Sequence, residues 1–119
     1  MRRVWIVAVS IGLWPVLAFG QTGWGRITKG GPFAEFRDGD WDMYQATVVR
    51  AADSAPDADP LTWTNTKTGA QGNVKVVKRY DRPGVGECRD LSGEASARGR
   101  TGPFAVTLCR KPGGKWLIG

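Results

Sequence analysis

The sequence contains no histidine and only two cysteines among its 119 residues. Hydrolytic or proton-transfer catalysis needs a positioned base whose pKa lies near neutrality, and histidine is the side chain that most often supplies it. Without histidine, the base would have to be a carboxylate or a lysine in a pocket, and a nucleophilic thiol would lack its usual partner. We therefore expect a protein that is not an enzyme, with no catalytic residue, no metal site and no cofactor.

Long apolar runs are also scarce, since residues 4–19 form the one such run and are short for a membrane span of about 20 residues. Arg2 and Arg3 precede this run, Pro15 interrupts it, and Ala18-Phe19-Gly20 closes it as a small-x-small cleavage site. This arrangement is typical of a secretory signal peptide, so we expect residues 1–20 to be removed and no membrane span to remain. An uncleaved anchor helix is the alternative interpretation.

The two cysteines have one possible pairing, and export into an oxidising compartment favours a disulfide. Arg98-Gly99 suits a two-residue hairpin turn because Gly accepts positive φ. A hairpin centred there sets Cys88 opposite Cys109 and Leu91 opposite Val106. Because strand side chains alternate, the same register predicts an apolar face and a disulfide face. Phe104 and Leu108 join the apolar face, and Asp90, Ser92, Glu94 and Thr107 join the cysteines.

An amphipathic helix is predicted over residues 39–54. Asp38 or Asp40 can accept hydrogen bonds from the first N–H groups, and Trp41, Tyr44 and Val48 form a buried stripe at helical spacing. The glycine-rich residues 21–37 before it are expected to be a flexible lead-in, so the folded domain is predicted over residues 38–119.

Alternating sequence follows the helix to the end of the chain. Strands are predicted over residues 61–65 and 74–80, in the Cys88–Cys109 hairpin and over residues 115–118, with a type II turn at Pro83-Gly84. Alternation would put Lys78 with Val74, Val76 and Tyr80 on one face of the second strand, and Lys75, Val77 and Arg79 on the other. The predicted fold is α+β: one N-terminal amphipathic helix packed on a small four- to five-stranded antiparallel β-meander, with one disulfide.

The order of several short motifs resembles the bacterial seventeen-kilodalton outer-membrane surface-antigen family, in its C-terminal domain. The motifs are Trp63-x-Asn65, Gly69-x-x-Gly72, Tyr80, Cys88-Arg89, Cys109-Arg110 and Gly114-x-Trp116. The resemblance covers about residues 38–118 and implies an exported envelope protein of a Gram-negative bacterium, in the periplasm or on the outer-membrane surface, with no established enzymatic activity. The chain lacks the lipidated cysteine and the glycine-zipper segment of fuller members. These differences favour a soluble periplasmic or surface-released form.

The charges are distributed unevenly, with net −5 over residues 33–59 and net +7 over residues 60–119. Such a pattern indicates either an anionic partner or two elements that attract each other, and a solvated basic face without a ligand is the simplest alternative. For an exported protein the expected partner is an anionic envelope polymer or another envelope protein, and not nucleic acid. The candidate binding residues are Arg98, Arg100, Lys75, Arg79 and Trp116.

Structural roles are predicted for Arg89, Arg110, Trp41, Trp63 and Tyr80. Because each arginine follows a cysteine, both arginines should point away from the disulfide, and we expect them to pair with the acidic helix start at residues 38–42. A calcium loop beginning at Asp38 is disfavoured, because Met43 and Val49 occupy the positions that need glycine and a carboxylate.

These observations together predict an exported, non-enzymatic envelope protein that acts as a binding or structural module. The alternative is a secreted inhibitor or adaptor that docks the basic tip Arg98-Gly99-Arg100 on an envelope hydrolase.

Overall fold

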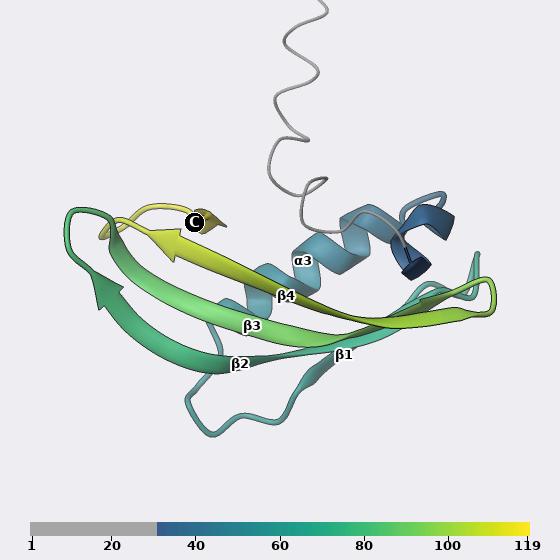
Figure 1. The fold of residues 1–119 in the computed structure, drawn as a ribbon, viewed down its shortest axis with the longest axis horizontal. Coiled ribbons are helices and arrows are strands. Elements are labelled where there is room, and N and C mark those ends of the chain that lie inside the picture. Colours follow the sequence, from purple (N-terminus) through teal and green to yellow (C-terminus); the bar gives the residue numbers. More distant parts are fainter. Residues whose placement is uncertain (1–30) are drawn as a thin grey trace, which may run out of the picture.

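A computed structural model describes residues 31–119, so the expected signal peptide and the lead-in up to residue 30 lie outside the described residues. The described chain begins with a 3₁₀ helix, η1 (Gly31–Glu35), and an α-helix, α3 (Asp40–Ala52). Five strands follow, β1 (Leu61–Thr64), β2 (Gln71–Arg82), β3 (Gly86–Ala97), β4 (Arg100–Arg110) and β5 (Leu117–Ile118). They form one antiparallel sheet in the order β1-β2-β3-β4-β5, which confirms the predicted meander (Figure 1).

The helix α3 lies along the concave side of the curved sheet (Figure 1). Tyr44 and Val48 are fully buried and Trp41 is partly buried, as the helical spacing predicted. Burial raises the pKa of the Tyr44 hydroxyl above its ordinary value, because the charged form is poorly solvated there. Within residues 31–119 no helix is long and apolar enough to cross a bilayer.

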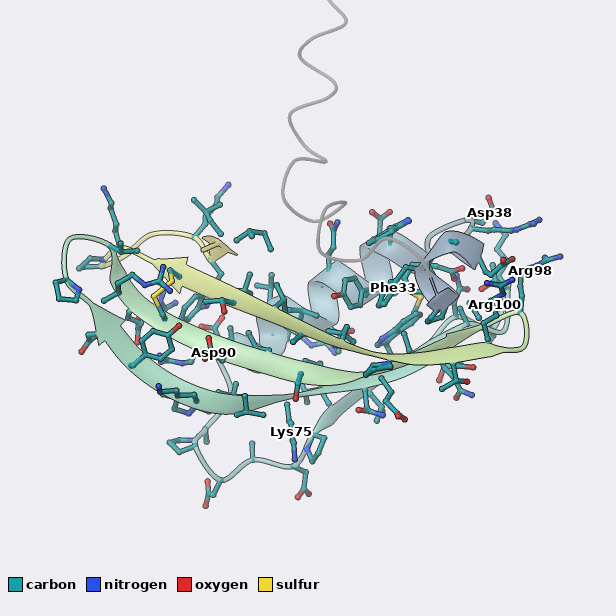
Figure 2. The ribbon with its side chains drawn as sticks, in the orientation of Figure 1. Phe33, Asp38, Lys75, Asp90, Arg98 and Arg100 are labelled. Carbon is teal, nitrogen blue, oxygen red and sulfur yellow. A yellow bond between two sulfur atoms is a disulfide. The ribbon has the colours of Figure 1, made fainter. Side chains whose placement is uncertain are left out.

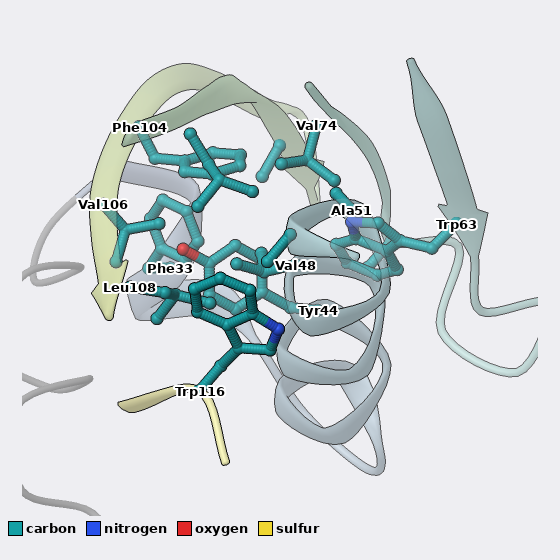
Figure 3. Packing of buried hydrophobic residues seen from close by; sticks show 14 of the residues in the cluster. Phe33, Tyr44, Val48, Ala51, Trp63, Val74, Phe104, Val106, Leu108 and Trp116 are labelled. Atoms are coloured by element: carbon teal, nitrogen blue, oxygen red, sulfur yellow. The ribbon is translucent and has the colours of Figure 1, made fainter. Parts of the chain in front are cut away.

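The ring of Phe33 in η1 extends the core at the start of α3 (Figure 3). Phe33 is 6% exposed, and its ring centroid lies 5.2 Å from that of Tyr44 and 6.1 Å from that of Phe104. Phe36 packs beside them, 5.6 Å from Trp63. Residues 31–37, assigned to the lead-in by sequence, therefore contribute side chains to the packed core.

The β3–β4 hairpin has the predicted register. Cys88 pairs with Cys109 and Leu91 with Val106, and the cysteines form a disulfide. Arg98 and Gly99 have φ of 50° and 82°, and positive φ at both positions is the signature of a type I′ turn. The turn type therefore fixes the register that brings the two cysteines together.

A β-bulge at Val77 corrects the predicted faces of β2. Val76 pairs with Leu91, whereas Lys78 pairs with Asp90, so one extra residue stands between them. A one-residue slip exchanges the faces of every side chain beyond it. Tyr80, which pairs with Cys88, consequently lies on the disulfide face and not with Val74 and Val76. Lys75, Lys78 and Tyr80 share the convex face, and Arg79 lies on the helix side.

The β2–β3 turn is also as predicted. The N–H of Val85 donates to the carbonyl of Arg82 at 3.0 Å, and Gly84 has φ of 79°, which a type II turn requires at that position. The strand β2, which leads into this turn, is longer than the predicted residues 74–80, because it begins at Gln71 and ends at Arg82.

Candidate functional site

Both arginines of the Cys-Arg dipeptides bind one carboxylate on the helix side of the sheet. Arg110 donates from Nε to Oε1 of Glu87 at 2.8 Å, and Arg89 donates to Oε2 of the same residue at 2.8 Å. The two guanidinium groups thus hold both oxygens of Glu87. Their orientation, opposite the disulfide, is the one predicted from strand alternation.

Trp116 completes this cluster from the C-terminal segment. The guanidinium of Arg110 lies 4.3 Å from the Trp116 ring centroid and that of Arg89 lies 5.2 Å from it, which are cation–π distances. The indole Nε1 donates to Oδ1 of Asp53 at 2.9 Å, and Arg110 donates to the same oxygen at 3.1 Å. We call these five residues the arginine–tryptophan cluster.

The position of the cluster corrects the expected pairing with the acidic helix start. Asp53 caps the C-terminal end of α3, whereas the helix start lies at the β3–β4 turn, at the other end of the sheet (Figure 2). The physical reason is the direction in which α3 crosses the sheet, which brings Asp53, and not Asp38, to the strand ends that carry the cysteines.

The electrostatics of the cluster indicate a structural ion pair. Hydrogen bonds from Arg110 and Arg89 lower the pKa of Glu87 below its ordinary value. The hydrogen bond with Glu87 raises the pKa of Arg110 further above neutrality. Neither group therefore exchanges a proton near neutral pH, so the cluster is unsuited to acid–base catalysis.

A second polar network surrounds Asp40, which is 1% exposed. Its Oδ1 accepts hydrogen bonds from Asn65 Nδ2 at 2.8 Å and Thr68 Oγ1 at 2.6 Å, and its Oδ2 accepts from the N–H of Arg37 at 2.7 Å. The amide of Asn65 also donates to the carbonyl of Asp38 at 2.9 Å. We call this set the Asp40 network.

The Asp40 network replaces the predicted helix cap. Gly39 occupies the N-cap position and α3 has no side-chain cap hydrogen bond. Asp40 instead ties the helix start to the loop between β1 and β2. The Trp63-x-Asn65 motif is thereby explained, because Trp63 packs in the core while Asn65 reaches the buried carboxylate.

The basic hairpin tip contacts an acidic residue of η1. Glu35 lies 3.5 Å from Nε of Arg98 and 3.8 Å from Nε of Arg100. The two arginine side chains remain 51% and 63% exposed, so these are surface ion pairs of small energy.

The structure does not bring the five candidate binding residues together. Arg98 and Arg100 lie at one end of the sheet, and Lys75 lies on its convex face (Figure 2). Arg79 donates to the carbonyl of Ala55 at 3.0 Å on the helix side. Trp116 is 8% exposed and belongs to the arginine–tryptophan cluster. In residues 31–119 no group of three or more acidic, cysteine or histidine side chains is placed to hold a metal ion.

Comparison with known proteins agrees with the family that the sequence motifs resemble. A family model described as 17 kDa outer membrane surface antigen matches residues 50–117. The chain belongs to this family. Curated surface antigens of 17 kDa from Rickettsia bellii (strain RML369-C) and Rickettsia prowazekii (strain Madrid E) are each 28% identical to it, over 79 and 76 residues.

The matches with these surface antigens cover 66% and 64% of this chain but 50% and 48% of the relatives. The chain therefore spans about half the length of the curated relatives it matches. No solved structure matches it.

The region that matches the surface antigen family contains the whole arginine–tryptophan cluster, Asp53 included. Sequence reasoning identified the arginines and Trp116 but missed Asp53, Glu87 and the Asp40–Asn65 pair. The position of Glu87 directly before Cys88-Arg89 was the available signal for one of them. Asp53 and Asp40 looked like ordinary helix-end acids, so no local signal distinguished them.

Proposed function

We propose that this member of the surface antigen family is an exported, non-enzymatic module of the Gram-negative cell envelope that binds an anionic envelope component. The observation that carries the proposal is which contacts the motif residues make. The arginines, the tryptophan and the asparagine of the motifs contact other residues of the same domain, within the arginine–tryptophan cluster and the Asp40 network. These residues thus serve the fold, and we assign the binding chemistry to exposed basic side chains outside the arginine–tryptophan cluster and the Asp40 network.

The distribution of those basic side chains supports an anionic partner. Lys75 and Lys78 are exposed on the convex face, and Lys111 and Lys115 are exposed near the C-terminal end. Within residues 31–119 none of these four lysines is in an ion pair, whereas Arg89, Arg98, Arg100 and Arg110 all are. Their ammonium groups can therefore contact phosphates or carboxylates without first breaking a salt bridge.

Two features support the location in the envelope. The first twenty residues have the charge, length and cleavage pattern of a signal peptide. The matched family is described as an outer membrane surface antigen.

The test begins with fractionation of the native host and mass analysis of the chain. We expect an envelope protein whose first residue is Gln21 and whose cysteines are oxidised. The purified protein should then bind deacylated lipopolysaccharide, a soluble phosphorylated polymer, with an affinity that falls as salt rises. A cytoplasmic chain with reduced cysteines would overturn the proposed location, and salt-independent binding would overturn the charge argument.

A further inference from the structure

Two turns and the last strand lie together at the end of the domain opposite the β3–β4 turn (Figure 1). We call this part, residues 82–86 and 111–118, the turn end. Between its segments lies a hollow of about 300 Å³ whose lining includes Val85, Lys111, Lys115, Leu117 and Ile118. A second, open hollow of about 700 Å³ shares Val85 and Lys111 with it. The two hollows of the turn end therefore adjoin at Val85 and Lys111.

Exposed large apolar side chains gather at the turn end. Leu117 is 66% exposed and Val85 is 36% exposed, and both line the smaller hollow. In residues 31–119, Val77 on the β2 bulge is the one other large hydrophobic residue with such exposure. Single exposed apolar residues are ordinary, whereas two that lie together in one hollow make it a candidate interaction site.

Cationic side chains surround the apolar ones. Arg82, Lys111 and Lys115 line the two hollows together with two acidic residues. One of these, Glu87, is held by the arginine–tryptophan cluster, so Asp81 is the remaining acidic residue of the lining. The turn end thus combines exposed aliphatic groups with a surplus of positive charge.

We propose that the turn end docks on an anionic phospholipid bilayer, with Val85 and Leu117 entering the headgroup region. Lys111 and Lys115 would contact lipid phosphates around them. Two contributions favour this binding: the apolar side chains are buried, and the neighbouring lysines are attracted to the negative surface. A soluble polyanion would use the lysines but leave Leu117 in water. The inference rests on the proposed function, because it names the anionic component.

The test is hydrogen exchange of the full chain, purified from the envelope of an expressing host with its disulfide intact. Vesicles of phosphatidylglycerol mixed with phosphatidylcholine are compared with vesicles of phosphatidylcholine alone. Local exchange reports the turn end separately from any contribution of the N-terminal apolar segment. We expect slower exchange in residues 82–86 and 111–118 with the anionic vesicles only.

Matched variants separate the apolar and charged contributions. Leu117→Ser should weaken binding to anionic vesicles about tenfold, and Val77→Ser, which changes another exposed apolar side chain outside the hollow, should not. Lys111→Gln should weaken binding about fivefold. Its control is Lys67→Gln, which changes an exposed lysine in the loop between β1 and β2. Melting temperatures of all four variants show that each is folded.

Several results would overturn the docking site. Exchange at the turn end that is unchanged by anionic vesicles, or equal effects of Leu117→Ser and Val77→Ser, would do so. Binding to deacylated lipopolysaccharide without binding to vesicles would remove the bilayer inference and leave the proposed function standing. Binding to neither would remove both.

Discussion

Replacing Asp40 by asparagine tests whether the buried carboxylate joins the helix to the β1–β2 loop. The carboxylate accepts three hydrogen bonds, two at Oδ1 and one at Oδ2. An asparagine amide can keep its oxygen toward Asn65 and Thr68, but its NH₂ group then faces the N–H of Arg37. In the opposite orientation the NH₂ group faces two donors, so the first orientation is the less costly one.

The expected cost follows from the better orientation. One hydrogen bond to a charged acceptor is lost and one donor faces another, which costs about 2 kcal/mol in the free energy of unfolding. For a domain of this size that loss lowers the melting temperature by about 10 °C. Asp42→Asn is the matched control, because Asp42 is exposed in the same first turn and its loss costs less than about 1 kcal/mol.

Urea unfolding followed by tryptophan fluorescence measures both variants. A double-mutant cycle with Asn65→Ala should give an interaction energy, because Asn65 donates directly to the Asp40 carboxylate. Equal midpoints for Asp40→Asn and Asp42→Asn, or strict additivity in the cycle, would refute the role of the Asp40 network.

Three further variants test the sheet and its C-terminal end. Arg110→Glu should lower the melting temperature in thermal denaturation, because it puts a carboxylate beside Glu87, whereas Lys111→Glu should not; equal effects would contradict the cluster. The pKa of Glu87 is lower in the folded protein than its ordinary value of 4.5, so the ionised carboxylate stabilises the fold at pH values above 4.5. This stability is lost as the pH falls through the lower pKa of the folded protein. Glu87→Gln should therefore flatten the acid limb of a pH–stability curve, and an unchanged limb would count against that ion pair. Gly93→Ala would drive its Cβ into the carbonyl oxygen of Asn73 and should cost about 3 kcal/mol in urea unfolding, so a neutral result would contradict the strand spacing.

Local sequence was sufficient for features that lie within one hairpin or one helix. The register of β3 and β4 follows from Arg98-Gly99, because a two-residue turn leaves one alignment of the flanking strands. The buried face of α3 follows from the helical spacing of Tyr44 and Val48. The type II turn follows from Pro83-Gly84, whose φ preferences match its two central positions.

The bulge in β2 shows where local pattern fails. Residues 74–80 alternate well enough to predict a regular strand, but Val77 has no partner across the sheet. A bulge depends on how the strand must bend to follow its neighbour, and one extra residue is enough to reverse the face of Tyr80. The prediction for Val74 and Val76 was therefore correct, and the prediction beyond the bulge was wrong.

The amino-acid sequence by itself determined the fold class, the disulfide and the family, since each depends on patterns within short segments or on the order of motifs. Only the tertiary structure decided which polar groups meet. Asp53 and Trp116 are 63 residues apart in the chain, and Asp40 and Asn65 are 25 apart. Contacts of that range depend on the direction of α3 across the sheet, which no local pattern encodes. The same direction of α3 brings the acidic helix start close to the hairpin tip. The turn end, at the other end of the sheet, carries exposed lysines and Leu117.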